Sequence, residues 1–178
     1  TPPTITPTPT QTPVRTPRQY LPALVKAAYL PLARVSTTPR DLAGYVGDTI
    51  PVDLLIENVI NLFGVEVTLS FDPNMLEVID AQPSLNGIQI VPGVFPDPAQ
   101  GFIARNQANN TTGLVQYSVT LLAPARPLSG SGRLATILFR AKQPGVTNVG
   151  FNLVRFASAA AESITSVGIG GSVTMSLP

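Results

Sequence analysis

The chain has 178 residues and a formal net charge of +1; hydrophobic residues make up 44% of it and charged residues only 12%. The hydrophobic share is enough for a core, and the scattered Lys and Arg residues form no basic stripe, so nucleic acid is not an expected partner. No run of about 18 apolar residues occurs, so no membrane-spanning helix is predicted. The sequence has no Cys and no His, which excludes thiol nucleophiles, Ser-His pairs, disulfides and the usual zinc ligands. We therefore expect no enzyme, no catalytic residues, no metal site and no cofactor.

The first eighteen residues (1–18) repeat Thr-Pro pairs. Proline fixes its own φ, lacks an amide donor and pushes the preceding residue toward extended geometry. This composition predicts a stiff, solvated linker of the kind that joins modules in secreted proteins, and it has neither the charged nor the apolar region of a signal peptide. Residues 19–30 are apolar and contain Pro22, so they are expected to connect linker and domain, with a short helix as one possible form. Whether this segment packs on the domain or has its own partner is left open.

From Pro31 to Pro178 the apolar residues recur with a period of two, in short runs bounded by Gly, Pro, Asn and Asp. This pattern predicts β-strands, and no long helical period interrupts it. The expected strands are 32–37, 49–58, 64–71, 75–81, 113–122, 133–141, 146–154, 161–164 and 171–177. Between them, residues 82–112 have a weak pattern and are expected to form a long excursion with a short strand at 102–105. The predicted fold class is all-β, a nine-stranded β-sandwich of jelly-roll topology over residues 31–178.

Several motifs follow one another in a recognisable order. A strand precedes Pro39, VGDT (46–49) opens an alternating strand, and FGVEVTLSFDPNMLEV (63–78) comes next. GSGRLATILFRAK (130–142) and GGSVTM (170–175) complete the set. Together these motifs resemble a cohesin domain, the receptor module that binds dockerin modules in cellulosomes and related extracellular assemblies. The resemblance extends over residues 31–178.

The resemblance implies a function and a partner. A cohesin is a non-catalytic module of scaffoldin-type proteins, so the expected partner is a dockerin-containing protein. Any calcium is expected in the loops of that dockerin. The resemblance also implies a place outside a bacterium or at its cell surface, in assemblies that degrade polysaccharides, and a monomer when the domain is isolated.

The resemblance also implies a binding face. In the well-known cohesins the dockerin lies on a sheet face built by the third, fifth, sixth and eighth strands. By alternation, the outward positions of the corresponding strands here are Gly64, Glu66, Thr68 and Ser70; Gln116 and Ser118, with Thr120 beyond them; Leu134, Thr136 and Leu138; and Ala161 and Ser163. Many cohesins have an Asn and an Asp where this chain has Gly64 and Glu66, so the carboxylate is kept and the amide is lost. The side chains of the expected face are mostly small, polar and uncharged, and two are leucines exposed to solvent. This composition is more typical of an interface than of a sheet face that only contacts water.

Each of these features also has a plainer interpretation. Glu66 alone is better explained as a solvated strand residue, and only the resemblance places it on a binding face. The two leucines could equally be covered by the excursion at 82–112. Asp72-Pro73-Asn74 could ligate calcium, but a turn is expected because Asp caps the backbone and Pro presets φ. Asp53 and Glu57 lie about 13 Å apart at the rise of a strand, too far for the carboxylate pair of a glycosidase.

Two other functions remain compatible with a sandwich. A carbohydrate-binding module stacks glycans on exposed aromatic rings, but the chain has no Trp, and its strand aromatics take core parity. Only Tyr45, Phe95 and Phe102 remain as possible loop aromatics. A structural spacer without a partner shares every compositional feature, and only the two leucines expected to be exposed weigh against it.

Overall fold

A computed structural model describes residues 32–178 of the chain. The predicted linker at 1–18 and the apolar segment at 19–30 lie outside the described residues. Within residues 32–178 the only helix is the short 3-10 helix η1 (Pro98–Gln100), and no helix there is long and apolar enough to cross a membrane.

The strands follow one another along the chain, and the longest connection among the described residues lies between β5 and β6. They are β1 (Ala33–Thr38), β2 (Asp41–Tyr45), β3 (Thr49–Leu62), β4 (Gly64–Ser70), β5 (Leu76–Val78), β6 (Val91–Pro92), β7 (Gly101–Asn109), β8 (Leu114–Leu121), β9 (Leu128–Ala141), β10 (Gly145–Ala157), β11 (Ser163–Ile164), β12 (Ser166–Ile169) and β13 (Gly171–Ser176). Each predicted strand coincides at least partly with one of these. The sequence pattern missed β2, β6 and β12 and predicted only part of β7, so the expected count of nine is not confirmed.

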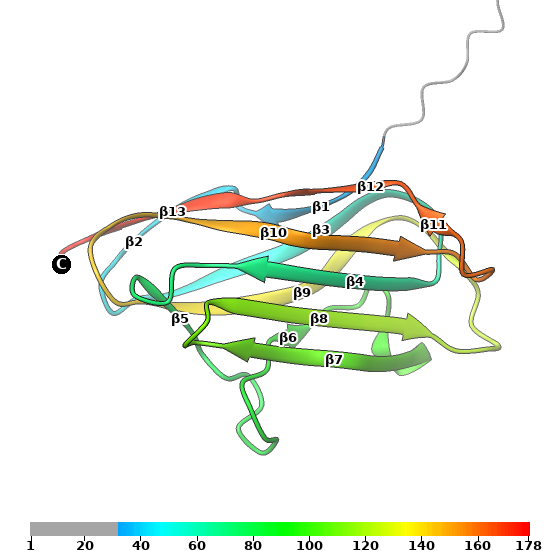
Figure 1. Cartoon of the computed structure of the whole chain (residues 1–178), viewed down its shortest axis with the longest axis horizontal. Coiled ribbons are helices and arrows are strands. Elements are labelled where there is room, and N and C mark those ends of the chain that lie inside the picture. Colours follow the sequence, from blue (N-terminus) through cyan, green and yellow to red (C-terminus); the bar gives the residue numbers. More distant parts are fainter. Residues whose placement is uncertain (1–31) are drawn as a thin grey trace, which may run out of the picture. The chain divides into compact units, whose positions relative to one another are not determined.

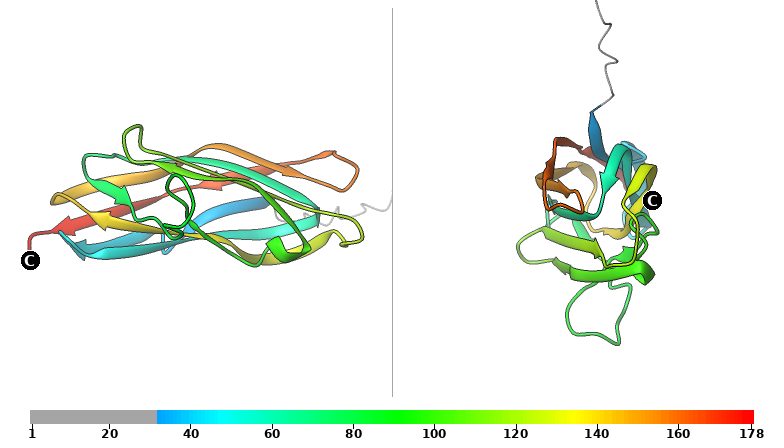
Figure 2. Two further views of the ribbon diagram at one scale, coloured as in Figure 1. Left: turned by 90° about the horizontal axis from the view of Figure 1, so that it is seen from below. Right: turned by 90° about the vertical axis from the view of Figure 1, so that its right-hand side faces the viewer.

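The strands form two facing sheets, and the predicted all-β sandwich of jelly-roll type is confirmed. One sheet has the order β12-β1-β3-β9-β5, with β6 paired to β9. The other has the order β2-β13-β10-β4-β8-β7, with β11 paired to β10. Figure 1 looks onto β10, β4, β8 and β7, which lie side by side, and Figure 2 shows the two layers from other directions.

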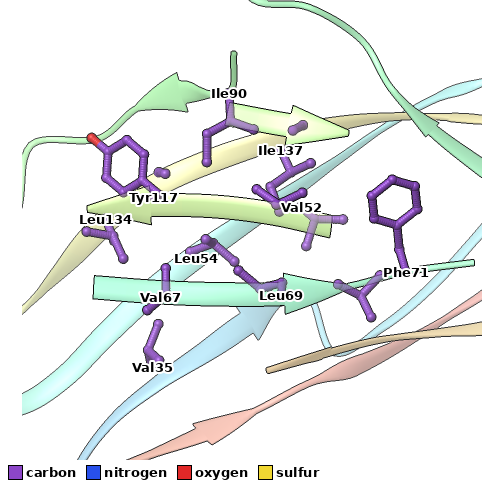
Figure 3. Close-up of a cluster of buried hydrophobic side chains, with 14 of the residues drawn as sticks. Val35, Val52, Leu54, Val67, Leu69, Phe71, Ile90, Tyr117, Leu134 and Ile137 are labelled. Carbon is purple, nitrogen blue, oxygen red and sulfur yellow. The ribbon is translucent and has the colours of Figure 1, made fainter. Parts of the chain in front are cut away.

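The core lies between the two sheets and follows the predicted alternation. On β4, Val65, Val67 and Leu69 are buried while the residues between them face outward. Figure 3 shows Val67 and Leu69 in a cluster with residues of the opposite sheet, such as Leu54 of β3. Burying one such aliphatic side chain stabilises the fold by about 1.5–3 kcal/mol. The core therefore fixes which face of β4 is outside.

Residues 79–100 link β5 to β7 and are held by polar side chains as well as by the short strand β6, which pairs with β9. The Asn106 amide accepts a hydrogen bond from the Ile90 backbone N–H at 2.9 Å and donates to the Ile90 carbonyl at 2.8 Å. Asn110 makes the same pair of bonds to Val78, at 2.7 and 3.0 Å. These amides satisfy backbone groups that no neighbouring strand pairs. An excursion with little periodicity is thereby ordered.

The connection after β4 is the predicted turn. The Asp72 carboxylate accepts a hydrogen bond from the Asn74 backbone N–H at 2.9 Å, and the Asp72 carbonyl accepts from Met75 and Leu76. The side chain that made calcium ligation conceivable is thus engaged in capping the backbone.

Candidate docking face

The outward residues of four neighbouring strands line up in rows across the second sheet. The strand register places Ala157 of β10, Gly64 of β4, Thr120 of β8 and Phe102 of β7 in one row. These side chains are small or apolar, and Phe102 is 48% exposed. This row forms an apolar end of the face.

The second row is polar and carries three charges. It consists of Arg155, Glu66, Ser118 and Arg105, again on β10, β4, β8 and β7. The Arg155 guanidinium lies 3.3 Å from the Glu66 carboxylate, and both side chains are largely exposed, so solvent weakens the pair. Arg105 donates a hydrogen bond of 2.7 Å to the side-chain carbonyl of Gln116.

The third row is uncharged and completes the centre of the sheet. It consists of Leu153, Thr68, Gln116 and Gln107. Beyond it, Ser70 donates a hydrogen bond of 2.9 Å to the Asn152 side chain. We call the three rows together the β4–β8 face.

A shallow hollow of about 260 Å³ opens on this face over Gly64. Ala104, Thr120 and Ala157 are among the residues that line it, and the Glu66–Arg155 pair lies at its rim. A Cβ atom built on Gly64 would come no closer than 3.4 Å to any neighbour, the nearest being the Thr120 hydroxyl. The hollow exists because three neighbouring positions carry a methyl group or less.

The structure brings six of the predicted residues together on β4 and β8. Gly64, Glu66 and Thr68 lie in the three rows and Ser70 lies just beyond them, all facing outward as expected. Gln116 and Ser118 face outward beside them on β8, and so does Thr120, the residue expected beyond them.

The prediction for Leu134, Thr136 and Leu138 is wrong, because all three lie on β9 in the opposite sheet. Leu134 is fully buried in the core (Figure 3), so it is not an exposed leucine of the face. The register between β3 and β9 shifts at this point, and Leu134 is the extra residue of a β-bulge. A bulge breaks the alternation of sides along a strand, so Leu134 and Ala135 are both buried.

The position predicted for Ala161 and Ser163 is also wrong, because neither lies on a strand next to β4. The strand beside β4 is β10, which ends at Ala157. Residues 161–164 follow a turn and include the short strand β11, which pairs antiparallel with the end of β10. Ser163 pairs with Ala157 in β11 and so borders the apolar row, whereas Ala161 lies in the preceding turn with φ of 60°. Neither residue stands at the centre of the face.

Sequence reasoning missed the outward residues of β7 and β10. These are Phe102, Arg105, Gln107, Leu153, Arg155 and Ala157. The register of β10 with β4 shifts between Phe151 and Leu153, so the alternation of 146–154 does not continue to the end of the strand. After the shift Phe156 is buried and Arg155 faces outward. A shift of register between Ile103 and Arg105 obscures the period of β7.

The outer side of the other sheet is built differently, because its charges engage one another. Arg34 of β1 donates two hydrogen bonds to Glu57 of β3, at 2.7 and 2.9 Å. The bonded Arg34 guanidinium holds the pKa of the Glu57 carboxyl below its usual range. Asp53 accepts a hydrogen bond from Thr136 and lies 4.0 Å from the Arg133 guanidinium. Each acid on these strands already has a partner within the sheet.

Comparison with known proteins identifies the family to which this sandwich belongs. A family model described as "Cohesin domain" matches residues 35–175. The chain therefore belongs to the cohesin domain family, whose members are non-catalytic binding modules. Comparison with curated proteins gave no match.

Solved structures of low sequence identity share the fold. A type II cohesin domain from the cellulosome of Acetivibrio cellulolyticus superposes with a TM-score of 0.67 at 14% identity, over 80% of this chain and 95% of that one. A type I cohesin–dockerin complex from Clostridium thermocellum gives 0.65 at 18% identity, over 83% and 95%. A non-cellulosomal cohesin from the archaeon Archaeoglobus fulgidus gives 0.63 at 16% identity, over 82% and 92%.

Proposed function

We propose that this cohesin binds a dockerin on the β4–β8 face and thereby anchors the dockerin-bearing protein in an extracellular or cell-surface complex. The observation that carries the proposal is the β4–β8 face itself. Its four adjacent strands present small side chains, an open hollow and only one ion pair, whereas the charges of the opposite sheet are already matched. Exposed apolar surface that is bordered by polar residues marks interaction sites.

The calcium of such a complex belongs to the dockerin. Among residues 32–178, no three Asp or Glu side chains gather closely enough to suggest a metal site. Calcium requires six to eight oxygen ligands, usually including several carboxylates. Removal of calcium should therefore act on the partner and leave the cohesin folded.

Glycan binding is less well supported. The exposed aromatic side chains of the second sheet are Tyr45 on β2 and Phe102 on β7, at opposite edges of the strand order. Phe95 is only partly exposed and packs against the core. A flat stacking platform needs neighbouring rings on one face, and these residues do not provide one.

The test is a binding comparison with two matched variants. Full-length chain is titrated with a panel of calcium-loaded type I and type II dockerins, including those of the same genome. Thr68→Arg places a charged side chain in the middle of the face and should weaken binding at least tenfold. Thr174→Arg adds the same side chain to β13, outside the three rows, and should leave the affinity unchanged. Equal binding by Thr68→Arg and the parent would contradict the assignment of the face.

A further inference from the structure

We infer that the partner inserts one apolar side chain into the hollow over Gly64 and sets a carboxylate against Arg105. This inference rests on the proposed function and names the chemistry of the partner surface. It comes from two features of the β4–β8 face that lie side by side: an unfilled apolar hollow and a cation without an anion.

The hollow has the size and lining for one side chain. Its volume is about 260 Å³, and an apolar cavity of about 150 Å³ is enough to hold a benzene ring. The methyl groups of Ala104 and Ala157 contribute to its walls, and the floor at Gly64 has no side chain. Removing these apolar surfaces from water by an apolar occupant is favourable.

The apolar surface continues beside the hollow. Phe102 stands next to Thr120 in the same row and is 48% exposed, and Leu122, just after β8, is 50% exposed. Large aliphatic and aromatic side chains exposed together mark interaction sites more often than solvated surface. A partner that fills the hollow would therefore also cover part of this end of the sheet.

Arg105 supplies the second contact. The face carries two guanidinium groups and one carboxylate, and the carboxylate of Glu66 pairs with Arg155 rather than with Arg105. Among the described residues no acid lies within ion-pair distance of Arg105. Its bond to Gln116 holds the guanidinium near the face. A planar guanidinium matches a carboxylate through two parallel hydrogen bonds, so an Asp or Glu of the partner complements this position.

The spacing of the two contacts fits a helix. Gly64 on β4 and Arg105 on β7 are separated by β8 and lie in adjacent rows. Two inter-strand distances across the sheet and two residues along the strands give a separation of about 12 Å. An α-helix advances about 5.4 Å per turn. A partner helix that crosses these strands would thus present an apolar residue and an acid about two turns apart.

The test is a graded series at Gly64 in the full-length chain. Gly64→Ala, Gly64→Val and Gly64→Leu fill the hollow progressively, and the backbone at Gly64 lies outside the left-handed region that only glycine favours. Affinity for a calcium-loaded dockerin that binds the parent is measured by calorimetry. Binding should be close to that of the parent for Ala and at least tenfold weaker for Leu. Ala43→Leu adds the same side chain to an exposed position of the edge strand β2 and should bind like the parent.

Arg105→Gln tests the electrostatic contact. It should weaken binding several-fold at low salt. The difference in affinity between variant and parent should shrink as salt is added, because salt screens the attraction between Arg105 and the carboxylate of the partner. Unchanged thermal melting of each variant confirms that the fold is intact. If the parent binds but both Gly64→Leu and Arg105→Gln bind equally well, the inference is overturned and the proposed function stands. If the parent binds no dockerin of the panel, both are overturned.

Discussion

Replacing Tyr117 by Phe should stabilise the domain. The Tyr117 ring is 1% exposed on the inner side of β8 (Figure 3), and its hydroxyl has no hydrogen-bond partner among the described residues. A buried polar group left without a partner costs about 1–3 kcal/mol. Phe keeps the ring and its packing, so the free energy of unfolding should rise by about 1 kcal/mol or more. For a domain of this size, that corresponds to a rise in Tm of about 2–4 °C per kcal/mol.

The pH dependence provides a second measure of the same substitution. Burial raises the pKa of Tyr117 from 10.0 to about 12. The folded state thus disfavours the phenolate, so the stability of the parent is intact below pH 10 and declines as pH rises toward 12. A tenfold change in a proton-binding constant corresponds to about 1.4 kcal/mol. The advantage of Tyr117→Phe should therefore grow by roughly 3 kcal/mol across that range.

The assay is urea unfolding followed by far-UV circular dichroism, at pH 7 and at several values between 9 and 12. If the free energy of unfolding depends equally steeply on urea concentration in parent and variant, a difference in the midpoint of unfolding reports a difference in stability. A variant that is less stable than the parent by 1 kcal/mol or more at pH 7 would refute the reasoning. It would show that the Tyr117 hydroxyl makes a favourable hydrogen bond in solution.

Two further predictions concern the opposite sheet. Because the pKa of Glu57 is lowered in the folded state, its pair with Arg34 contributes stability at pH values above 4.5, the ordinary pKa of glutamate. This contribution is lost as the pH falls through the lowered pKa of Glu57. Glu57→Gln should therefore unfold at lower urea than the parent at pH 7, with a smaller difference at pH 3; an equal difference at both would contradict the pairing. Leu134→Ala should cost about 2–5 kcal/mol because Leu134 is fully buried. Leu138→Ala, at a half-buried position on the same strand, should cost clearly less, and similar losses would place Leu134 outside the core.

The alternation of apolar residues is sufficient to predict most of the sandwich. On β4 it gives the correct inner and outer residues at every position, because the strand is regular and pairs without a shift to β8. On β9 it fails at Leu134, where the bulge lets two successive residues face the core. A bulge depends on the pairing with β3, and that pairing is not encoded in the period of β9 itself.

The composition of the β4–β8 face can be predicted only in part, for a similar reason. On β7 the usual pattern of apolar inner and polar outer residues does not hold. Phe102 is exposed to water, while the Asn106 side chain accepts a hydrogen bond from the Ile90 backbone N–H in the excursion. The pattern of β7 therefore predicts only a short strand, and β9 is expected on the wrong sheet. Arg105 and Arg155 come to the same row only through the order β10-β4-β8-β7, which joins segments far apart in the sequence. Strand order of this kind is a property of the whole fold rather than of local pattern.

The most direct test of the proposed function is titration calorimetry of the full chain against the dockerin panel, first with calcium and then with EDTA. A one-to-one complex that is abolished by EDTA, while the melting temperature of the cohesin itself stays the same, is the expected result. No binding by any dockerin, or a complex that EDTA leaves intact, would contradict the account. In that case retardation of the chain by soluble glycans in affinity electrophoresis would identify a carbohydrate-binding module, and its absence would favour a structural spacer.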